Sequence, residues 1–164
     1  MQARFQNLPF KLSSLDGRNF VLLADAFYVA RDGARYCLPA GAASDGASTP
    51  PAVWPLVPPF GSYWPAAYLH DTAYRNTLLA FNGRMFAPAN LPKEKCDALL
   101  LEAMESLGVS AVERQLIYDG VVLGGTSSFD QDRASSGAPV SSSGSFPKPC
   151  FNAPGQATGA PTTA

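Results

Sequence analysis

The chain has 164 residues, of which 46% are apolar and 15% charged, and its formal net charge is −1. This length and composition suit one domain of ordinary size with a packed core, followed by a tail. The near-zero net charge gives no indication of nucleic acid or an anionic membrane as a partner, and no apolar run approaches the roughly 18 residues that predict a transmembrane helix.

The first part of the chain, up to about residue 60, has the pattern of short β-strands. It begins without the apolar segment of a secretory signal, so no such signal is expected. "FVLLADAFYVA" (20–30) is rich in β-branched and aromatic residues, and "ARYCLPA" (34–40) follows the turn "RDG". Composition alone would also permit a helix over 20–30, but the turn favours a β-hairpin. "LPFKL" (8–12) is expected to form a further, shorter strand.

A long proline-rich and glycine-rich loop follows, "PAGAASDGASTPPAVWPLVPPFGSYWP" (39–65). Its prolines exclude a regular helix or a central strand. Long ordered loops in compact domains are usually functional or cover a core. The aromatic residues of the loop favour packing against the domain, so we expect residues 41–64 to lie across the helices.

Residues 65–124 are expected to form helices, with a break at "NGRMFAPAN" (82–90). Pro65 suits the first turn of the first helix. "LPKEKCDALLLEAMESLG" (91–108) has an early acidic residue and a terminal glycine. "SAVERQLIYDGVVLGG" (110–125) opens with a capping box, a serine followed three residues later by a glutamate, and ends in a glycine pair.

After Gly125 the composition changes to serine, glycine, alanine, proline and threonine. Such a segment cannot bury enough apolar surface to fold alone. We therefore expect a single globular domain over 1–125 and an extended, low-complexity tail over 126–164. The predicted fold class is α+β: a small N-terminal β-hairpin or sheet, a long proline-rich loop and two to three packed helices.

The only histidine of the chain, His70, indicates where chemistry could occur. Helical spacing places His70 and Tyr74 on one face, and Asp97 is the acidic residue on an apolar stripe of the next long helix. If these helices pack antiparallel, Asp97 can face His70, fix its tautomer and leave the other ring nitrogen as a base for activating water. The alternative is structural: a buried histidine bonded to Asp97, a packed tyrosine, and Asp71 paired on the surface with Arg75.

"HDTAY" (70–74), followed by an aspartate that opens the apolar helix segment "CDALLLEAM" (96–104), resembles the phospholipase A2 pattern, and most closely its viral capsid-borne form. The resemblance implies that His70 activates water, Asp71 binds calcium, Tyr74 supports the site and Asp97 orients the histidine. The glycine-rich calcium loop of that family is replaced here by "PPFGSYWP" (58–65), so calcium enters only with this resemblance and no other cofactor is expected.

Residues 36–110 also resemble a family of small uncharacterised phage and prophage proteins. The resemblance is carried by "DGASTP", a Pro-Pro-x-Gly segment and an A-A-x-x-H-D-x-x-Y helix. This resemblance implies a phage origin but no activity. Together with the proline-rich loop and the tail, it leads us to expect a virion-associated or tail-associated interaction protein. The protein would be made in the host cytoplasm and carried in the virion, and its loop and tail would dock on other virion proteins. The alternative is a water-activating hydrolase that acts on a lipid ester through His70, Asp97 and Tyr74. No nucleic-acid partner is indicated, and a lipid partner belongs only to the alternative.

Overall fold

The computed structural model describes residues 1–14, 16–17, 19–45 and 61–136. Within these ranges the chain forms two antiparallel sheets and three helices, which confirms the α+β fold class. In chain order the elements are β1 (Arg4–Phe5), β2 (Leu12–Ser13), β3 (Phe20–Leu22), β4 (Ala26–Val29), β5 (Arg35–Leu38), β6 (Ala43–Ser44), α1 (Trp64–Tyr74), β7 (Leu79–Phe81), β8 (Phe86–Pro88), α2 (Lys93–Ser106) and α3 (Ala111–Ser136).

The predicted hairpin is formed by β4 and β5, which pair in register from Ala26 opposite Leu38 to Val29 opposite Arg35. Gly33 lies in its turn with φ 89°, a left-handed conformation that glycine adopts without steric cost. The hairpin belongs to a five-stranded sheet of order β1-β4-β5-β7-β8, and a three-stranded sheet of order β2-β3-β6 lies beside it. The short strand expected over 8–12 is wrong in its position, because β2 (Leu12–Ser13) shares only Leu12 with it.

The run 20–30 differs from the single strand that its composition predicts. It divides into β3 and β4, which belong to different sheets. The division falls around Asp25, whose Oδ1 accepts a hydrogen bond from the backbone N–H of Ala40 at 2.8 Å. The backbone carbonyl of Asp25 also accepts a hydrogen bond from the side chain of Asn7 at 2.7 Å. These tertiary bonds hold the chain where it passes from one sheet to the other.

A second hairpin, formed by β7 and β8, occupies the stretch between α1 and α2. β8 lies in the expected break, but β7 lies in the part predicted to be helical, so the helix prediction is wrong there. The side chain of Asn82 accepts hydrogen bonds from the backbone N–H groups of Arg84 and Met85, both at 3.0 Å, and closes the turn. β7 also pairs with β5, so an edge that is otherwise unpaired gains a neighbour. A strand this short has little local signal, because its stability comes from that pairing.

The helices begin close to the predicted positions. Pro65 lies in the first turn of α1, and the Ser110 hydroxyl accepts a hydrogen bond from the N–H of Glu113 at 3.2 Å, as a capping serine should. α3 ends later than expected, because the helix continues beyond Gly125 to Ser136. The prediction of an extended chain is therefore wrong for 126–136. Residues 137–164 of the predicted tail, and residues 46–60 of the predicted loop, lie outside the described residues.

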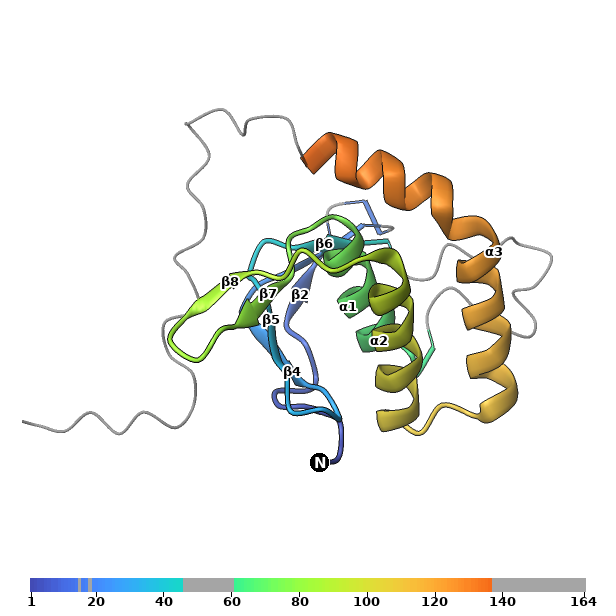
Figure 1. The fold of residues 1–164 in the computed structure, drawn as a ribbon, viewed down its shortest axis with the longest axis horizontal. Coiled ribbons are helices and arrows are strands. Elements are labelled where there is room, and N and C mark those ends of the chain that lie inside the picture. Colours follow the sequence, from blue (N-terminus) through green and yellow to red (C-terminus); the bar gives the residue numbers. More distant parts are fainter. Residues whose placement is uncertain (15, 18, 46–60, 137–164) are drawn as a thin grey trace, which may run out of the picture.

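Figure 1 shows the two sheets on one side of the molecule, with α1 and α2 packed beside them and α3 outermost. The main core fills the space between the sheets and the helices. Its largest fully buried side chains include Tyr28 from the sheet, Tyr68 and Leu69 from α1, and Leu100 and Met104 from α2. Among the described helices, none is long and apolar enough to cross a membrane. This core holds α1 against α2, and these two helices carry the candidate site.

Candidate functional site

The candidate site lies where the C-terminal half of α1 faces the first two turns of α2. α1 supplies His70 and Tyr74, one helical turn apart, and their rings lie with centroids 4.0 Å apart. α2 supplies Lys93 and Asp97, which are also four residues apart. Residues at this spacing share a helix face. When these faces of α1 and α2 meet, the four side chains come together.

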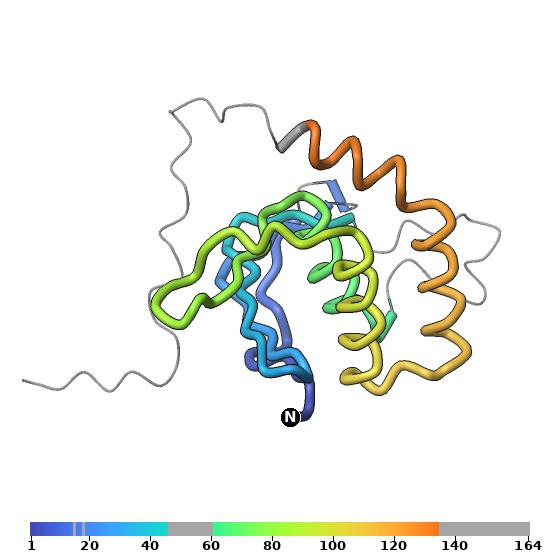
Figure 2. Tube along the Cα trace, viewed as in Figure 1, coloured from blue at the N-terminus to red at the C-terminus, as the bar shows by residue number. Residues whose placement is uncertain are grey.

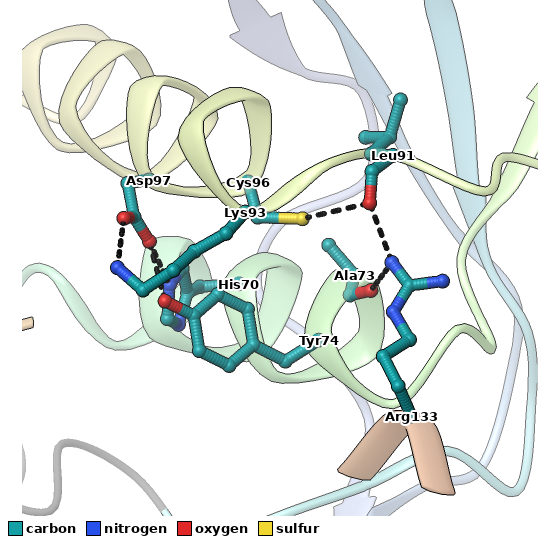
Figure 3. Close-up of polar contacts among 8 residues, drawn as sticks. All are labelled: His70, Ala73, Tyr74, Leu91, Lys93, Cys96, Asp97 and Arg133. Atoms are coloured by element: carbon teal, nitrogen blue, oxygen red, sulfur yellow. Dashed lines mark hydrogen bonds and ion pairs between the residues drawn. The ribbon is translucent and has the colours of Figure 1, made fainter. Parts of the chain in front are cut away.

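Asp97 is the centre of this group (Figure 3). Its Oδ1 lies 3.0 Å from Nε2 of His70 and accepts a hydrogen bond from the Tyr74 hydroxyl at 2.6 Å. Its Oδ2 accepts a hydrogen bond from Nζ of Lys93 at 2.7 Å. The expected contact between His70 and Asp97 is therefore present, and Tyr74 belongs to the same network.

The network is buried and ionised. His70 is 7% exposed and Asp97 is 3% exposed. Burial opposes ionisation of Asp97, but the hydrogen bonds from His70, Lys93 and Tyr74 outweigh it and lower the pKa of Asp97 to about 2. Burial, followed by the hydrogen bond to Asp97, raises the pKa of Tyr74. Near neutral pH, Asp97 is thus a carboxylate and Tyr74 a hydroxyl donor.

The charge on Asp97 fixes the orientation of the imidazole. An ionised carboxylate can only accept hydrogen bonds, so Nε2 of His70 carries the proton between them. In the neutral ring the other nitrogen, Nδ1, then has a free lone pair. Among the residues that the structure describes, none forms a hydrogen bond with Nδ1. This arrangement can accept a proton at Nδ1 while Asp97 stabilises the resulting imidazolium.

Asp71 points away from this network, toward β6. Its Oδ2 accepts a hydrogen bond from the Ser44 hydroxyl at 2.6 Å, and its residue is partly buried. Burial raises the pKa of Asp71 to about 7; Ser44 and Arg75 oppose this change, and the charges of Asp45 and Asp132 add to it. The structure therefore brings together three of the four predicted site residues and places Asp71 in a separate contact.

The groups around Asp71 do not fit a calcium site. Calcium takes six to eight oxygen ligands, whereas no group of three or more histidine, cysteine, aspartate or glutamate side chains that could hold a metal occurs in the described part of the chain. Arg75 brings a positive charge close to Asp71. The nearby carboxylate of Asp45 pairs with Arg75 at 3.7 Å.

Lys93 is a site residue that the sequence analysis missed. It is the partner that holds the second carboxylate oxygen of Asp97. The signal was present in the sequence as a lysine four residues before an aspartate within one helix. Surface pairs with this spacing are common and weak, and only the burial of Asp97 distinguishes this one from them.

The raised pKa of Asp71 gives a prediction for stability against pH. In the unfolded chain an aspartate ionises near pH 4, but in the folded chain Asp71 does so at about 7. The folded state therefore binds the proton more tightly, and its stability should fall as pH rises from about 4 to about 7 and then level off. In Asp71→Asn this fall in the thermal midpoint should be smaller.

Thermal unfolding from pH 4 to 8 measures this effect. Asp119→Asn serves as the matched control, since Asp119 is exposed on α3. If the thermal midpoint changed with pH equally in the wild type and in Asp71→Asn, Asp71 would ionise in the folded protein as it does in the unfolded chain.

Comparison with known proteins identifies one family. A family described as a protein of unknown function, DUF1353, matches residues 20–121, from β3 into α3, and this range includes all the site residues described above. No curated protein and no solved structure matches the chain. The matched range is more than half of the 164 residues. The chain therefore belongs to the DUF1353 family.

Proposed function

We propose that the chain is a water-activating hydrolase in which His70 is the general base and Asp97 orients it. The observation that supports this proposal is the 3.0 Å contact between Nε2 of His70 and Oδ1 of Asp97, which leaves Nδ1 available. The substrate class we propose is a carboxylic ester, and specifically a lipid ester, as the resemblance to phospholipase A2 implies.

The reaction needs no side-chain nucleophile. Nδ1 of His70 takes a proton from water as the water oxygen attacks the ester carbonyl, which forms a tetrahedral intermediate. Asp97, already ionised, stabilises the positive charge on the imidazole. When the intermediate collapses, the bond to the leaving alcohol breaks and His70 returns the proton to that oxygen. The products are a carboxylic acid and an alcohol, and His70 is again neutral.

Tyr74 and Lys93 act through Asp97. Together they hold both of its oxygens, at 2.6 Å and 2.7 Å, so the carboxylate cannot rotate away from the ring. Their positive and partly positive hydrogens also favour the ionised form of Asp97. Both are positioning residues for the base, since neither supplies the proton acceptor.

The direct test uses the wild-type full chain with fluorogenic esters of increasing acyl length and with mixed phospholipid vesicles. Each substrate is assayed with calcium and with a chelator. We expect hydrolysis that persists in the chelator, because the donors around Asp71 do not fit calcium. A folded wild-type protein that hydrolyses none of these substrates under either condition would exclude the proposal and leave the network around Asp97 as a structural tie between α1 and α2.

We also propose a second function, that of a phage virion or tail-associated interaction protein. The loop and tail expected to dock on neighbouring subunits lie outside the described residues. One described feature favours the proposal: α3 exposes three large apolar side chains on one face, with Val112 72%, Leu116 46% and Leu123 86% exposed. Exposed apolar patches commonly mark interaction sites.

Mass spectrometry of purified phage particles from the host that encodes the chain tests this second function. The chain should be present at a fixed ratio to the known virion proteins, and Leu116→Glu should lower that ratio. Its absence from purified particles would remove the virion role. The two functions are compatible, because a hydrolase can be carried in a virion.

A further inference from the structure

The second half of α3 lies over the candidate site and outside the family match. The match ends at residue 121, whereas α3 continues to Ser136. Figures 1 and 2 show α3 running beside α2 and then turning across the ends of the other helices. Helices bend where glycines weaken them, and α3 contains the pair Gly124 and Gly125. The segment that covers the site is thus an addition to the matched part of the chain.

The covering segment touches the body of the protein along one narrow seam. Gly125 and Phe129, four residues apart, are partly buried, while the residues between them are exposed. The Phe129 ring meets the Tyr74 ring edge-on, with centroids 5.1 Å apart. A Cβ atom at Gly125 would lie 2.8 Å from the Tyr74 hydroxyl and 3.4 Å from Cε of Lys93, so the helix backbone rests directly on these two site residues.

Arg133 extends the seam by one more turn (Figure 3). Its Nη2 donates hydrogen bonds to the backbone carbonyls of Leu91 at 2.6 Å and Ala73 at 3.2 Å. The same Leu91 carbonyl accepts a contact from the thiol of Cys96 at 3.8 Å. Arg133 therefore joins α3 to the end of α1 and to the chain just before α2, directly beside the buried Cys96.

The seam, formed by Gly125, Phe129 and Arg133, makes few contacts for a helical segment of this length. Thr126, Ser127 and Ser128 are exposed, and Leu123 is 86% exposed, so this segment buries little apolar surface. Segments with few buried apolar contacts open locally at a small cost in free energy. The glycine pair lowers the cost further, because glycine disfavours helix by up to about 1 kcal/mol relative to alanine.

We propose that residues 126–136 of α3 are a cover that opens about Gly124 and Gly125 and so admits substrate to the His70–Asp97 site. The role of the cover in admitting substrate rests on the proposed hydrolase function, but the opening of the helix itself does not. The closed cover lies against Tyr74 and Lys93, the two residues that hold the carboxylate of Asp97. Opening breaks the contacts of Phe129 and Arg133 and leaves α1, α2 and the sheets in place.

The rate at which the Cys96 thiol is alkylated measures the opening and requires no assay of activity. It is a free, buried thiol, and burial raises its pKa to about 11, so it reacts slowly with an alkylating reagent while the cover is closed. The full chain is treated with iodoacetamide under native conditions, quenched and digested with trypsin. The peptide 96–114 contains Cys96 as its only cysteine, so mass spectrometry of this peptide gives the rate at that position.

Phe129→Ala and Arg133→Ala are each expected to speed alkylation of Cys96 about tenfold, the ratio that follows from losing one aromatic or charge-assisted contact of the closed state. Leu123→Ala is the matched control on the exposed face of the same helix and should leave the rate unchanged. In the wild type, low concentrations of urea should change the rate little, because a local opening exposes little surface.

Equal rates in the wild type and in both seam variants would overturn the proposal. The proposal would also be overturned if the rate of Cys96 alkylation rose with urea concentration as steeply as global unfolding does. The hydrolase proposal fails by a different result, the lack of ester hydrolysis in the folded wild type, so the two outcomes are distinguishable. When hydrolysis is present, the seam variants should also lower KM, because substrate no longer competes with the closed cover.

Discussion

His70→Gln is expected to lower kcat for ester hydrolysis by about 10²–10⁴-fold, the usual contribution of a general base. Glutamine has a similar reach, and its amide N–H can still donate a hydrogen bond to Asp97, so the buried carboxylate keeps a partner. What it lacks is the basic lone pair at the position of Nδ1. The variant should therefore remain folded and bind substrate with a KM close to that of the wild type.

Steady-state kinetics of purified variants check this expectation, with circular dichroism to confirm folding. Tyr74→Phe is the matched comparison, because it removes one hydrogen bond to Asp97 and leaves the base in place. It should reduce kcat by much less than His70→Gln does. If folded His70→Gln keeps the wild-type kcat, His70 is not the base, and the hydrogen bond to Asp97 has a structural purpose alone.

Asp97→Ala is expected to cause the largest loss of stability. The carboxylate accepts hydrogen bonds from His70, Tyr74 and Lys93, and its removal leaves all three donors without this acceptor in a buried place. Removing one partner of a buried charged pair costs about 3–5 kcal/mol. For a chain of this size, that loss corresponds to a decrease of roughly 10 °C or more in the thermal midpoint.

Urea and thermal unfolding measure this loss, with Asp119→Ala as the control at an exposed aspartate of α3. The lowered pKa of Asp97 gives a second check. The unfolded aspartate ionises near pH 4 and the folded one at about 2. The stabilisation is thus complete above about pH 4 and is lost as the pH falls toward 2. A midpoint for Asp97→Ala within a few degrees of the wild type would show that the network contributes little to folding.

The helical part of the candidate site was predictable from local patterns. The spacing of His70 and Tyr74 places them on one face whenever that segment is helical, and Asp97 interrupts an apolar stripe of its own helix. A buried carboxylate requires a partner, and the chain has a single histidine on a comparable face. These two facts predicted the hydrogen bond between them, although the connection between the two helices is longer than expected and contains the β7–β8 hairpin.

The strands and the end of α3 were less predictable, for one physical reason. β7 is stabilised by pairing with β5, far away in the sequence, and a three-residue segment has almost no preference of its own. Likewise, α3 continues past its glycine pair because Phe129 and Arg133 find partners on α1 and beside α2. In both cases distant contacts override a local signal that favoured a turn or a tail.

The sequence by itself predicted the α+β class, two to three helices and the contact between His70 and Asp97. Helical periodicity acts within one segment, and the cost of burying a charge requires that each buried group find a partner. Only the tertiary structure decided three further points. Asp71 accepts a hydrogen bond from Ser44 of β6. Lys93 donates a hydrogen bond to the second carboxylate oxygen of Asp97. Arg133 bonds α3 to the carbonyl of Leu91, beside the site. The contacts of Asp71 and Arg133 depend on which surfaces meet after the sheets and helices pack, and side-chain spacing along one element carries no information about that. The spacing of Lys93 and Asp97 was visible in the sequence, but only the packing of α2 buries Asp97 and so distinguishes this pair from a surface pair.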